Sequence, residues 1–174
     1  MREIFVKFII PLTGKCILIY RKQIKGLRAE SGFFGNMKEL TLEATPANVD
    51  IAIEFVDEML DEYGCGIKEK TAIDVAVDEL FSNIAHYAYN PETGYATVLV
   101  DVLKDPLSVE ITFVDNGKPY DPLAKADPDT TQSIEEREIG GMGIFIVKKS
   151  MDAVNYEYKD GKNILTIKKN FNSE

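Results

Sequence analysis

The chain has 174 residues, enough for one domain with a substantial core or for one domain plus an arm. Its composition, 45% hydrophobic and 28% charged, is typical of a soluble globular protein, and two cysteines are too few for a disulfide framework. We therefore expect a cytoplasmic protein with reduced thiols. The net charge of −9 disfavours direct binding of nucleic acid, because neutralisation of phosphates dominates that affinity.

The charge is divided unevenly along the chain. Residues 1–36 hold seven Lys or Arg and two Glu, a net charge of +5, whereas the remainder holds 13 basic and 27 acidic residues, a net charge of −14. Lys7, Pro11 and Lys15 interrupt the apolar run in this basic arm, so it is too broken for a membrane span, and it lacks a signal-peptide cleavage site. Three interpretations stay open: an arm that binds a membrane surface or a partner, a disordered tail, or sequence upstream of a native start at Met37.

From residue 37 onward, hydrophobic periodicity predicts one domain covering residues 37–174. Alternating apolar residues predict strands, at 39–43, 96–102, 107–113, 154–158 and 163–168. Helical periodicity predicts helices, at 45–64, 66–90 and 144–149. This order fits an α+β two-layer sandwich, in which a mixed, mainly antiparallel sheet has its helices packed on one face.

The predicted helix 66–90 carries two stripes. An apolar stripe should face the core, and its members are Ile73, Ala76, Val77, Leu80, Phe81, Ile84 and Ala88. Glu79, Asn83 and His86 form a polar stripe at i, i+4 and i+7, which is either a solvated flank or the edge of a pocket. The carboxylate of Glu79 could take a proton from water or a hydroxyl group, and the amide oxygen of Asn83 suits Mg²⁺.

Between residues 118 and 140 the periodicity disappears, which indicates a lid or a disordered insertion. Gly140, Gly141 and Gly143 follow and open the next predicted helix. Successive glycines let backbone N–H groups converge, and a helix N-terminus adds partial positive charge, so this motif could hold a phosphate. Glycine runs also end loops for purely steric reasons, so the motif alone is weak evidence.

Two further candidate positions lie in or after strands. Asp115-Asn116-Gly117 follows the strand 107–113. It is either a common turn or an aspartate that accepts from an exocyclic amine, with Gly117 letting a flat ligand lie against the backbone. Thr166 in the last strand could reach an adenine-side water or a phosphate, although its β propensity alone also explains its presence.

Together and in this order, these motifs resemble the Bergerat-fold (GHKL) ATP-binding domain shared by gyrase, Hsp90, histidine kinases and MutL. Within that superfamily the chain looks most like the stand-alone bacterial anti-sigma-factor serine/threonine kinases, over residues 37–170. The resemblance implies that Glu79 is the general base, Asn83 the Mg²⁺ ligand and Asp115 the acceptor for the adenine N6 amine. The other cofactor-binding positions that it implies are Gly117, Gly140, Gly141, Gly143 and Thr166.

The same resemblance implies ATP and Mg²⁺ as cofactors and phosphorylation of a small antagonist protein as the activity. The implied partner is a STAS-type anti-sigma-factor antagonist, with a sigma factor as a candidate second partner. We also expect a homodimer, for which the layer of residues 37–64 is a plausible surface, and no membrane span.

Two departures from the family motifs keep other functions open. Pro119 stands where the Asp-x-Gly box usually continues to another glycine, and His86 stands where kinase members often carry Lys or Arg. A neutral imidazole is a poorer phosphate partner, which favours a nucleotide-gated binding module without kinase activity as the alternative. A detached histidine-kinase-type ATPase domain is a further alternative, although we do not expect His86 to accept the phosphate.

If residues 1–36 lie upstream of the native start, the protein isolated from its own organism begins at Met37. Mass spectrometry of the intact native protein measures this directly. A native N-terminus at Met1 contradicts the interpretation.

Overall fold

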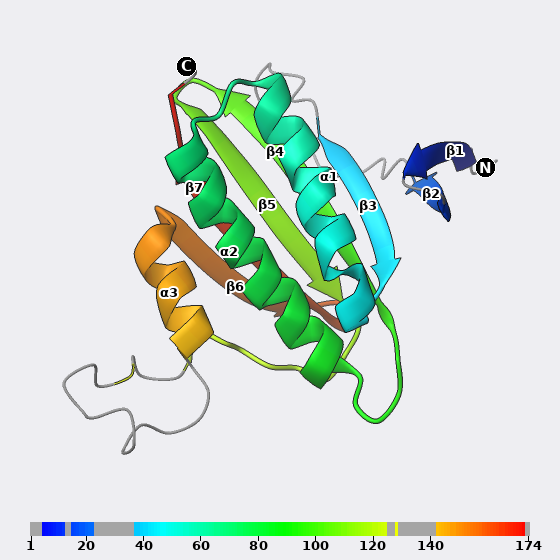
Figure 1. Cartoon of the computed structure of the whole chain (residues 1–174). Helices are drawn as coiled ribbons and strands as arrows, with labels where there is room; N and C mark the ends of the chain where they lie inside the picture. Colours follow the sequence, from blue (N-terminus) through cyan, green and yellow to red (C-terminus); the bar gives the residue numbers. More distant parts are fainter. Residues whose placement is uncertain (1–4, 13–14, 23–36, 125–127, 129–141, 173–174) are drawn as a thin grey trace.

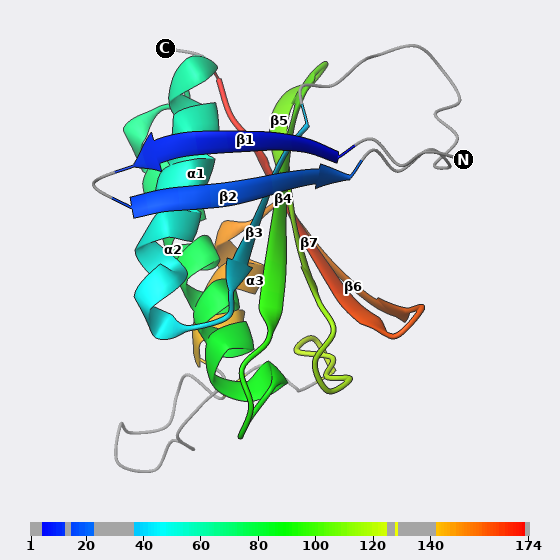
Figure 2. The same ribbon diagram turned by 90° about the vertical axis from the view of Figure 1, so that its right-hand side faces the viewer.

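The computed structural model describes residues 5–12, 15–22, 37–124, 128 and 142–172. Within these ranges a five-stranded sheet carries its helices on one face (Figure 1), and the edge-on view shows two layers (Figure 2). The strands of this sheet are β3 (Lys38–Glu43), β4 (Tyr95–Lys104), β5 (Leu107–Asp115), β6 (Ala153–Lys159) and β7 (Lys162–Asn170). The helices are η1 (Pro46–Asn48), α1 (Val49–Glu62), α2 (Ile67–Asn83), η2 (Ile84–Ala88) and α3 (Met142–Ser150).

The α+β prediction is confirmed, and each expected strand and helix is present. Two further strands that the sequence analysis did not predict, β1 (Phe5–Leu12) and β2 (Lys15–Lys22), pair antiparallel in a separate sheet. The three interpretations of residues 1–36 (a binding arm, a disordered tail or sequence upstream of a native start) all stay predictions. The expected long loop at 118–140 lies largely outside the described residues. No helix in the described part of the chain is long and apolar enough to cross a membrane.

One detail of the predicted sheet is wrong: it is not mixed, because every neighbouring pair of its strands is antiparallel. The strand order is β3-β4-β5-β7-β6. β5 comes before α3 in the chain and β6 after it, and the two strands run in the same direction. They do not pair, because β7, which forms a hairpin with β6, lies between them in the sheet. This order places Asp115, the last residue of β5, directly opposite Asn163 near the start of β7.

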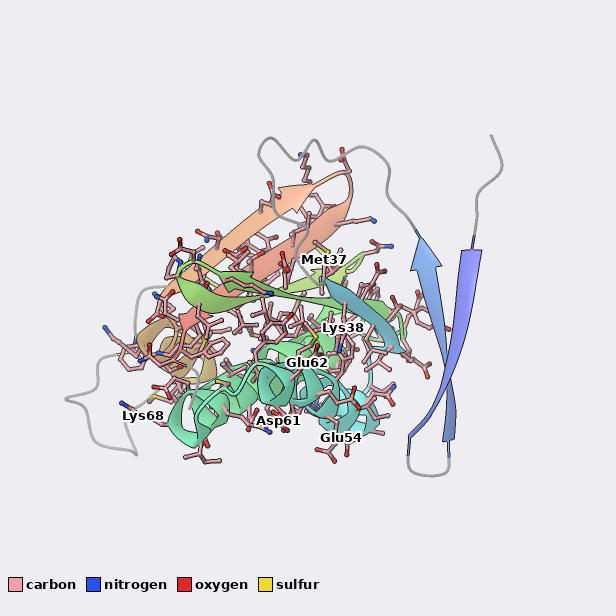
Figure 3. All side chains as sticks on the ribbon, turned by 90° about the horizontal axis from the view of Figure 1, so that it is seen from above. Met37, Lys38, Glu54, Asp61, Glu62 and Lys68 are labelled. Atoms are coloured by element: carbon pink, nitrogen blue, oxygen red, sulfur yellow. The ribbon has the colours of Figure 1, made fainter. Side chains whose placement is uncertain are left out.

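The core lies between the sheet and α1 and α2. Alternate residues of β4 and β5 face the helices, and the largest buried side chains include Phe81 of α2 and Phe113 of β5. Burial of one such phenylalanine contributes roughly 1.5–3 kcal/mol to folding. At the rim, Lys38 of β3 and Glu62 of α1 form an exposed ion pair of 3.1 Å (Figure 3), which adds little stability. Because the apolar stripe of α2 is buried in this core, it fixes the rotation of α2 about its axis, and with it the direction of the polar stripe.

The predicted helix 66–90 is not α-helical throughout. α2 ends at Asn83, and the next five residues form the π-helix η2. Single π turns inside α-helices occur frequently at functional sites. Here the π turn lies directly after Asn83, one of the candidate site residues.

A cluster of charged side chains joins α1 and α2. Lys70 of α2 contacts Asp61 at 2.7 Å and Asp57 at 3.3 Å, both from α1. Asp74 lies one turn after Lys70, and its Oδ1 atom is buried without a hydrogen-bond partner among the described residues, as is Oδ1 of Asp57. Burial, followed by contact with the Asp57 carboxyl group, raises the pKa of Asp74 to about 6. Three carboxyl groups thus share one cation, and Asp74 is the least well compensated.

This raised pKa predicts a pH-dependent stability. Between about pH 4 and pH 6 the folded protein keeps a proton on Asp74, whereas the unfolded chain has released it. The free energy of unfolding therefore falls as the pH rises through this range, and the loss is complete above pH 6. Asp74→Asn should match the wild type in unfolding free energy near pH 4. At pH 7.5 it should be more stable by about 1 kcal/mol, a value reduced for partial exposure to water.

Urea unfolding followed by circular dichroism at both pH values measures the difference. Glu54→Gln is the control, because it removes one negative charge from the exposed face of α1 (Figure 3) and should show no such pH-dependent gain. Equal stabilities of the wild type and Asp74→Asn at pH 7.5 would contradict the prediction.

Candidate functional site

Asp115 is a buried carboxylate at the end of β5, with 6% of its surface exposed. It faces the helical layer because it continues the inward-facing series of Ile111 and Phe113. Its Oδ1 atom accepts hydrogen bonds from the backbone N–H of Gly117 at 2.8 Å and from Nδ2 of Asn163 at 2.9 Å. Its second oxygen, Oδ2, has no hydrogen-bond partner within the described residues. The carboxylate is thus held by one oxygen and can accept from a ligand through the other.

Asn163 of β7 is buried to the same extent as Asp115, and the sequence analysis did not identify it as a site residue. It follows the tight turn between β6 and β7, so it looked like a turn residue. The signal that could have found it is a polar residue in register with Leu165 and Ile167, which face the core. Its amide contacts four groups in all.

The segment after Asp115 is fixed against the end of η2. The N–H of Lys118 donates to the carbonyl oxygen of Ala88 at 2.9 Å, and the N–H of Asn116 donates to the hydroxyl of Tyr89 at 2.9 Å. A Cβ atom on Gly117 would lie 2.6 Å from Cβ of Ala88, closer than real contacts allow. Gly117 is therefore required by this approach to the helix, a different reason from the expected one of admitting a flat ligand.

The departure at Pro119 comes directly after this fixed segment. The side chain of Lys118 also donates to the carbonyl oxygen of Asn90 at 2.9 Å, so Asn116 and Lys118 are tied to the last residue of η2 and to the two residues that follow it. Pro119 thus follows a segment that these hydrogen bonds already hold in place.

Glu79 and Gly143 lie against each other where α2 meets α3. A Cβ atom built on Gly143 would overlap the Glu79 carboxylate, with Oε1 at 3.0 Å and Oε2 closer. The backbone at the start of α3 therefore approaches the carboxylate as closely as only glycine permits. Asn83 follows Glu79 by one turn on the same side of α2 and is half-buried. Gly140 and Gly141 lie outside the described residues.

The helix formed by α2 and η2 links these two groups of residues. Glu79 in the second half of α2 contacts Gly143, and Ala88 at the end of η2 contacts Gly117, an advance of roughly 13 Å along the axis. Asn83 lies between them. The arrangement has a hydrogen-bond acceptor for an amine, Asp115, near the end of η2 and a carboxylate, Glu79, beside the start of α3.

Comparison with known families identifies the fold. The family described as "Histidine kinase-like ATPase domain" matches residues 42–169, which include Glu79, Asn83, Asp115 and Gly143. The chain belongs to the histidine kinase-like ATPase domain family. The resemblance to the Bergerat-fold superfamily stated from the motifs is thereby confirmed.

Curated relatives of this ATPase domain carry the names expected from the motifs. The serine/threonine-protein kinase BtrW of Bordetella bronchiseptica is 25% identical over 74% of this chain and 89% of its own length. The anti-sigma F factor of Caldanaerobacter subterraneus subsp. tengcongensis is 29% identical over 76% of this chain and 91% of its own. The serine-protein kinase RsbW of Listeria monocytogenes is 26% identical over 74% and 84%.

Among solved structures, the RsbU and RsbW domains of Rv1364c from Mycobacterium tuberculosis superpose with a TM-score of 0.56. The match covers 78% of this chain and 32% of that chain at 17% identity, so it supports the fold alone.

The structure does not bring Thr166 to the other candidate residues of the ATPase domain. Leu165 and Ile167 face the core, so Thr166 between them faces the opposite, helix-free side of the sheet. There its hydroxyl lies 2.9 Å from that of Thr112. The expected role of Thr166 beside adenine or a phosphate does not fit this register, and Asn163 occupies the position next to Asp115.

His86 is also outside the group. It lies in η2, is exposed, and its Nδ1 is 2.7 Å from the carbonyl oxygen of Ser82, to which it donates. Its ring is thus tied to the backbone of its own helix.

A magnesium ion would have few protein ligands here. Within the described ranges no three His, Cys, Asp or Glu residues gather as a metal site. Mg²⁺ keeps several waters and binds through one or two protein oxygens plus substrate phosphates, which fits a single amide from Asn83 beside the Glu79 carboxylate.

The contact between Gly143 and Glu79 predicts a selective loss of function. Gly143→Ala places a methyl group on the carboxylate and should displace it, lowering ATP turnover by about tenfold or more. Gly161→Ala is the matched control. Gly161 has a φ of +77° in the β6–β7 turn and open space around it, so alanine should cost about 1 kcal/mol of stability and leave turnover unchanged.

Thermal unfolding and ATP turnover, measured on both variants, separate the two effects. Wild-type turnover in Gly143→Ala would contradict the account of Glu79.

Proposed function

We propose that this protein binds Mg·ATP and transfers the γ-phosphate to a serine or threonine of a small partner protein. The observation that carries the proposal is the contact between the Glu79 carboxylate and the backbone of Gly143 at the start of α3. A base beside a helix N-terminus suits a reaction in which a hydroxyl group attacks a phosphate. The serine and threonine kinases among the relatives support it.

Each residue of the site has a proposed role. Asp115 accepts a hydrogen bond from the exocyclic amine of adenine through Oδ2. Glu79 orients the attacking hydroxyl group and takes its proton, and the backbone N–H groups of Gly140, Gly141 and Gly143 hold the phosphate oxygens. Asn83 holds Mg²⁺, which when bound neutralises charge on the phosphates.

The proposed partners follow from the same relatives. A STAS-type anti-sigma-factor antagonist is the proposed substrate, and a sigma factor is a second proposed partner, because one relative is named an anti-sigma F factor. The net charge of −14 after residue 36 favours protein partners over nucleic acid. We also propose a homodimer in which residues 37–64 of two copies pack together.

Incubation with γ-labelled ATP and a candidate antagonist tests the proposed activity. Wild-type protein should label the antagonist. Glu79→Gln should keep ATP binding but lower the labelling rate by about 100-fold or more, because it removes the proton acceptor. Asp115→Asn should lose ATP binding and keep the fold, because an N–H then faces the adenine amine.

Glu157→Gln, which neutralises an exposed side chain on β6, is the control and should label the antagonist at the wild-type rate. ATP binding without labelling, and with no effect of Glu79→Gln, would replace the kinase with a nucleotide-gated binding module. A label lost in acid would indicate transfer to histidine instead.

A further inference from the structure

The buried amide of Asn163 has only one possible orientation. The N–H of Tyr120 can only donate, and it lies 3.2 Å from Oδ1 of Asn163. The carbonyl oxygen of Lys118 can only accept, and it lies 3.1 Å from Nδ2. Two backbone groups therefore fix which end of the amide is oxygen and which is nitrogen, independently of any side chain.

The remaining capacity of the amide is also used. The second N–H of Nδ2 points to Oδ1 of Asp115 at 2.9 Å, and the hydroxyl of Tyr156 donates to Oδ1 of Asn163 at 2.7 Å. Burial raises the pKa of Tyr156, so its hydroxyl stays protonated and remains a donor at neutral pH. Both donors and both acceptor positions of Asn163 are thus occupied, and a flip of the amide would break its bonds to Tyr120, Lys118 and Asp115.

This arrangement determines what Asp115 can offer a ligand. Oδ1 of Asp115 is occupied by two N–H donors, from Gly117 and Asn163, so the carboxylate is held against rotation about its Cβ–Cγ bond. Oδ2 is then held in one direction as an acceptor. A purine with an amine at this position gains a charge-assisted hydrogen bond, whereas one with a carbonyl or a hydrogen gains none.

We propose that Asn163 is a positioning residue that sets the base specificity of the site: by fixing Asp115 as an oriented acceptor, it selects purine bases that carry an exocyclic amine. The inference rests on the proposed ATP site and deepens it. Because the same amide binds residues 118 and 120, it also couples the orientation of Asp115 to the segment that leaves β5.

The test compares Mg·ATP with purine riboside triphosphate, which has the same ring system, sugar and phosphates but lacks the amine. Dissociation constants from equilibrium dialysis give the preference of each variant for ATP. Wild-type protein should prefer ATP by about tenfold or more. In Asn163→Ala the preference should fall towards one, because ATP binds more weakly while the affinity for the analogue hardly changes.

Asn163→Asp provides a second, nearly isosteric variant in case alanine prevents folding. It keeps an acceptor for Tyr120 and Tyr156 but presents oxygen to Asp115, so it should lose the preference as well. Asn155→Ala is the matched control, because it removes an amide from the neighbouring strand on the exposed face of the sheet, and it should bind as the wild type does.

The outcomes separate this inference from the proposed function. If both ligands weaken by the same factor in Asn163→Ala and in Asn163→Asp, Asn163 is merely structural and the inference is overturned. If Asp115→Asn abolishes the preference but neither Asn163 variant does, the inference fails while the ATP site stands. If Asp115→Asn leaves ATP binding unchanged, the proposed nucleotide site itself is wrong.

Discussion

The hydrogen bond between Asp115 and Asn163 joins the ends of the two central strands β5 and β7, and the geometry of the candidate site depends on it. Both side chains are buried, and leaving either unpaired costs about 1–3 kcal/mol or more. Their pairing lets the sheet end in polar groups beneath the helical layer. It also fixes the direction in which the chain leaves β5, so that residues 117 and 118 meet Ala88.

That meeting connects the sheet to the helix that carries the other half of the site. The apolar face of α2 is held by the core, so its polar face is directed to the start of α3. There Glu79 is pressed against Gly143. The two glycines, Gly117 and Gly143, thus act in the same way at two points along one helix, the end of η2 and the second half of α2. Each lets backbone come closer to a neighbouring element than a side chain would permit.

Much of this could be predicted from the sequence because the signals are local. Periodicity fixed the strands and the core face of α2, and the spacing of Glu79, Asn83, Asp115 and the glycines indicated the family. The last strand was harder: Ile164, Leu165 and Ile167 put apolar residues on both faces, so the alternation did not show which face Thr166 takes. The register of Asn163 with Leu165 and Ile167 became informative only once the structure showed that these two residues face the core.

Other features depend on contacts between distant residues and leave no local signal. Residues 84–88 have ordinary helical periodicity, so their sequence does not predict that η2 is a π-helix. It also does not predict that the end of η2 contacts residues 117 and 118. The reason for Gly143 was likewise invisible, since glycine before a helix predicts phosphate binding whether or not a carboxylate lies against it. A wholly antiparallel sheet could be predicted only if it were known that β7 lies between β5 and β6 in the sheet.

In the proposed complex the ligand lies between the helical layer and the end of the sheet, along α2 and η2. Two-dimensional NMR of the ¹⁵N-labelled protein, titrated with a non-hydrolysable ATP analogue and Mg²⁺, tests it most directly. The account predicts large shifts of the backbone amides of Glu79, Asn83, Gly117 and Gly143, with Asn155 and Thr166 unchanged. Shifts centred on Asn155 and Thr166, with the first four amides unmoved, would contradict it.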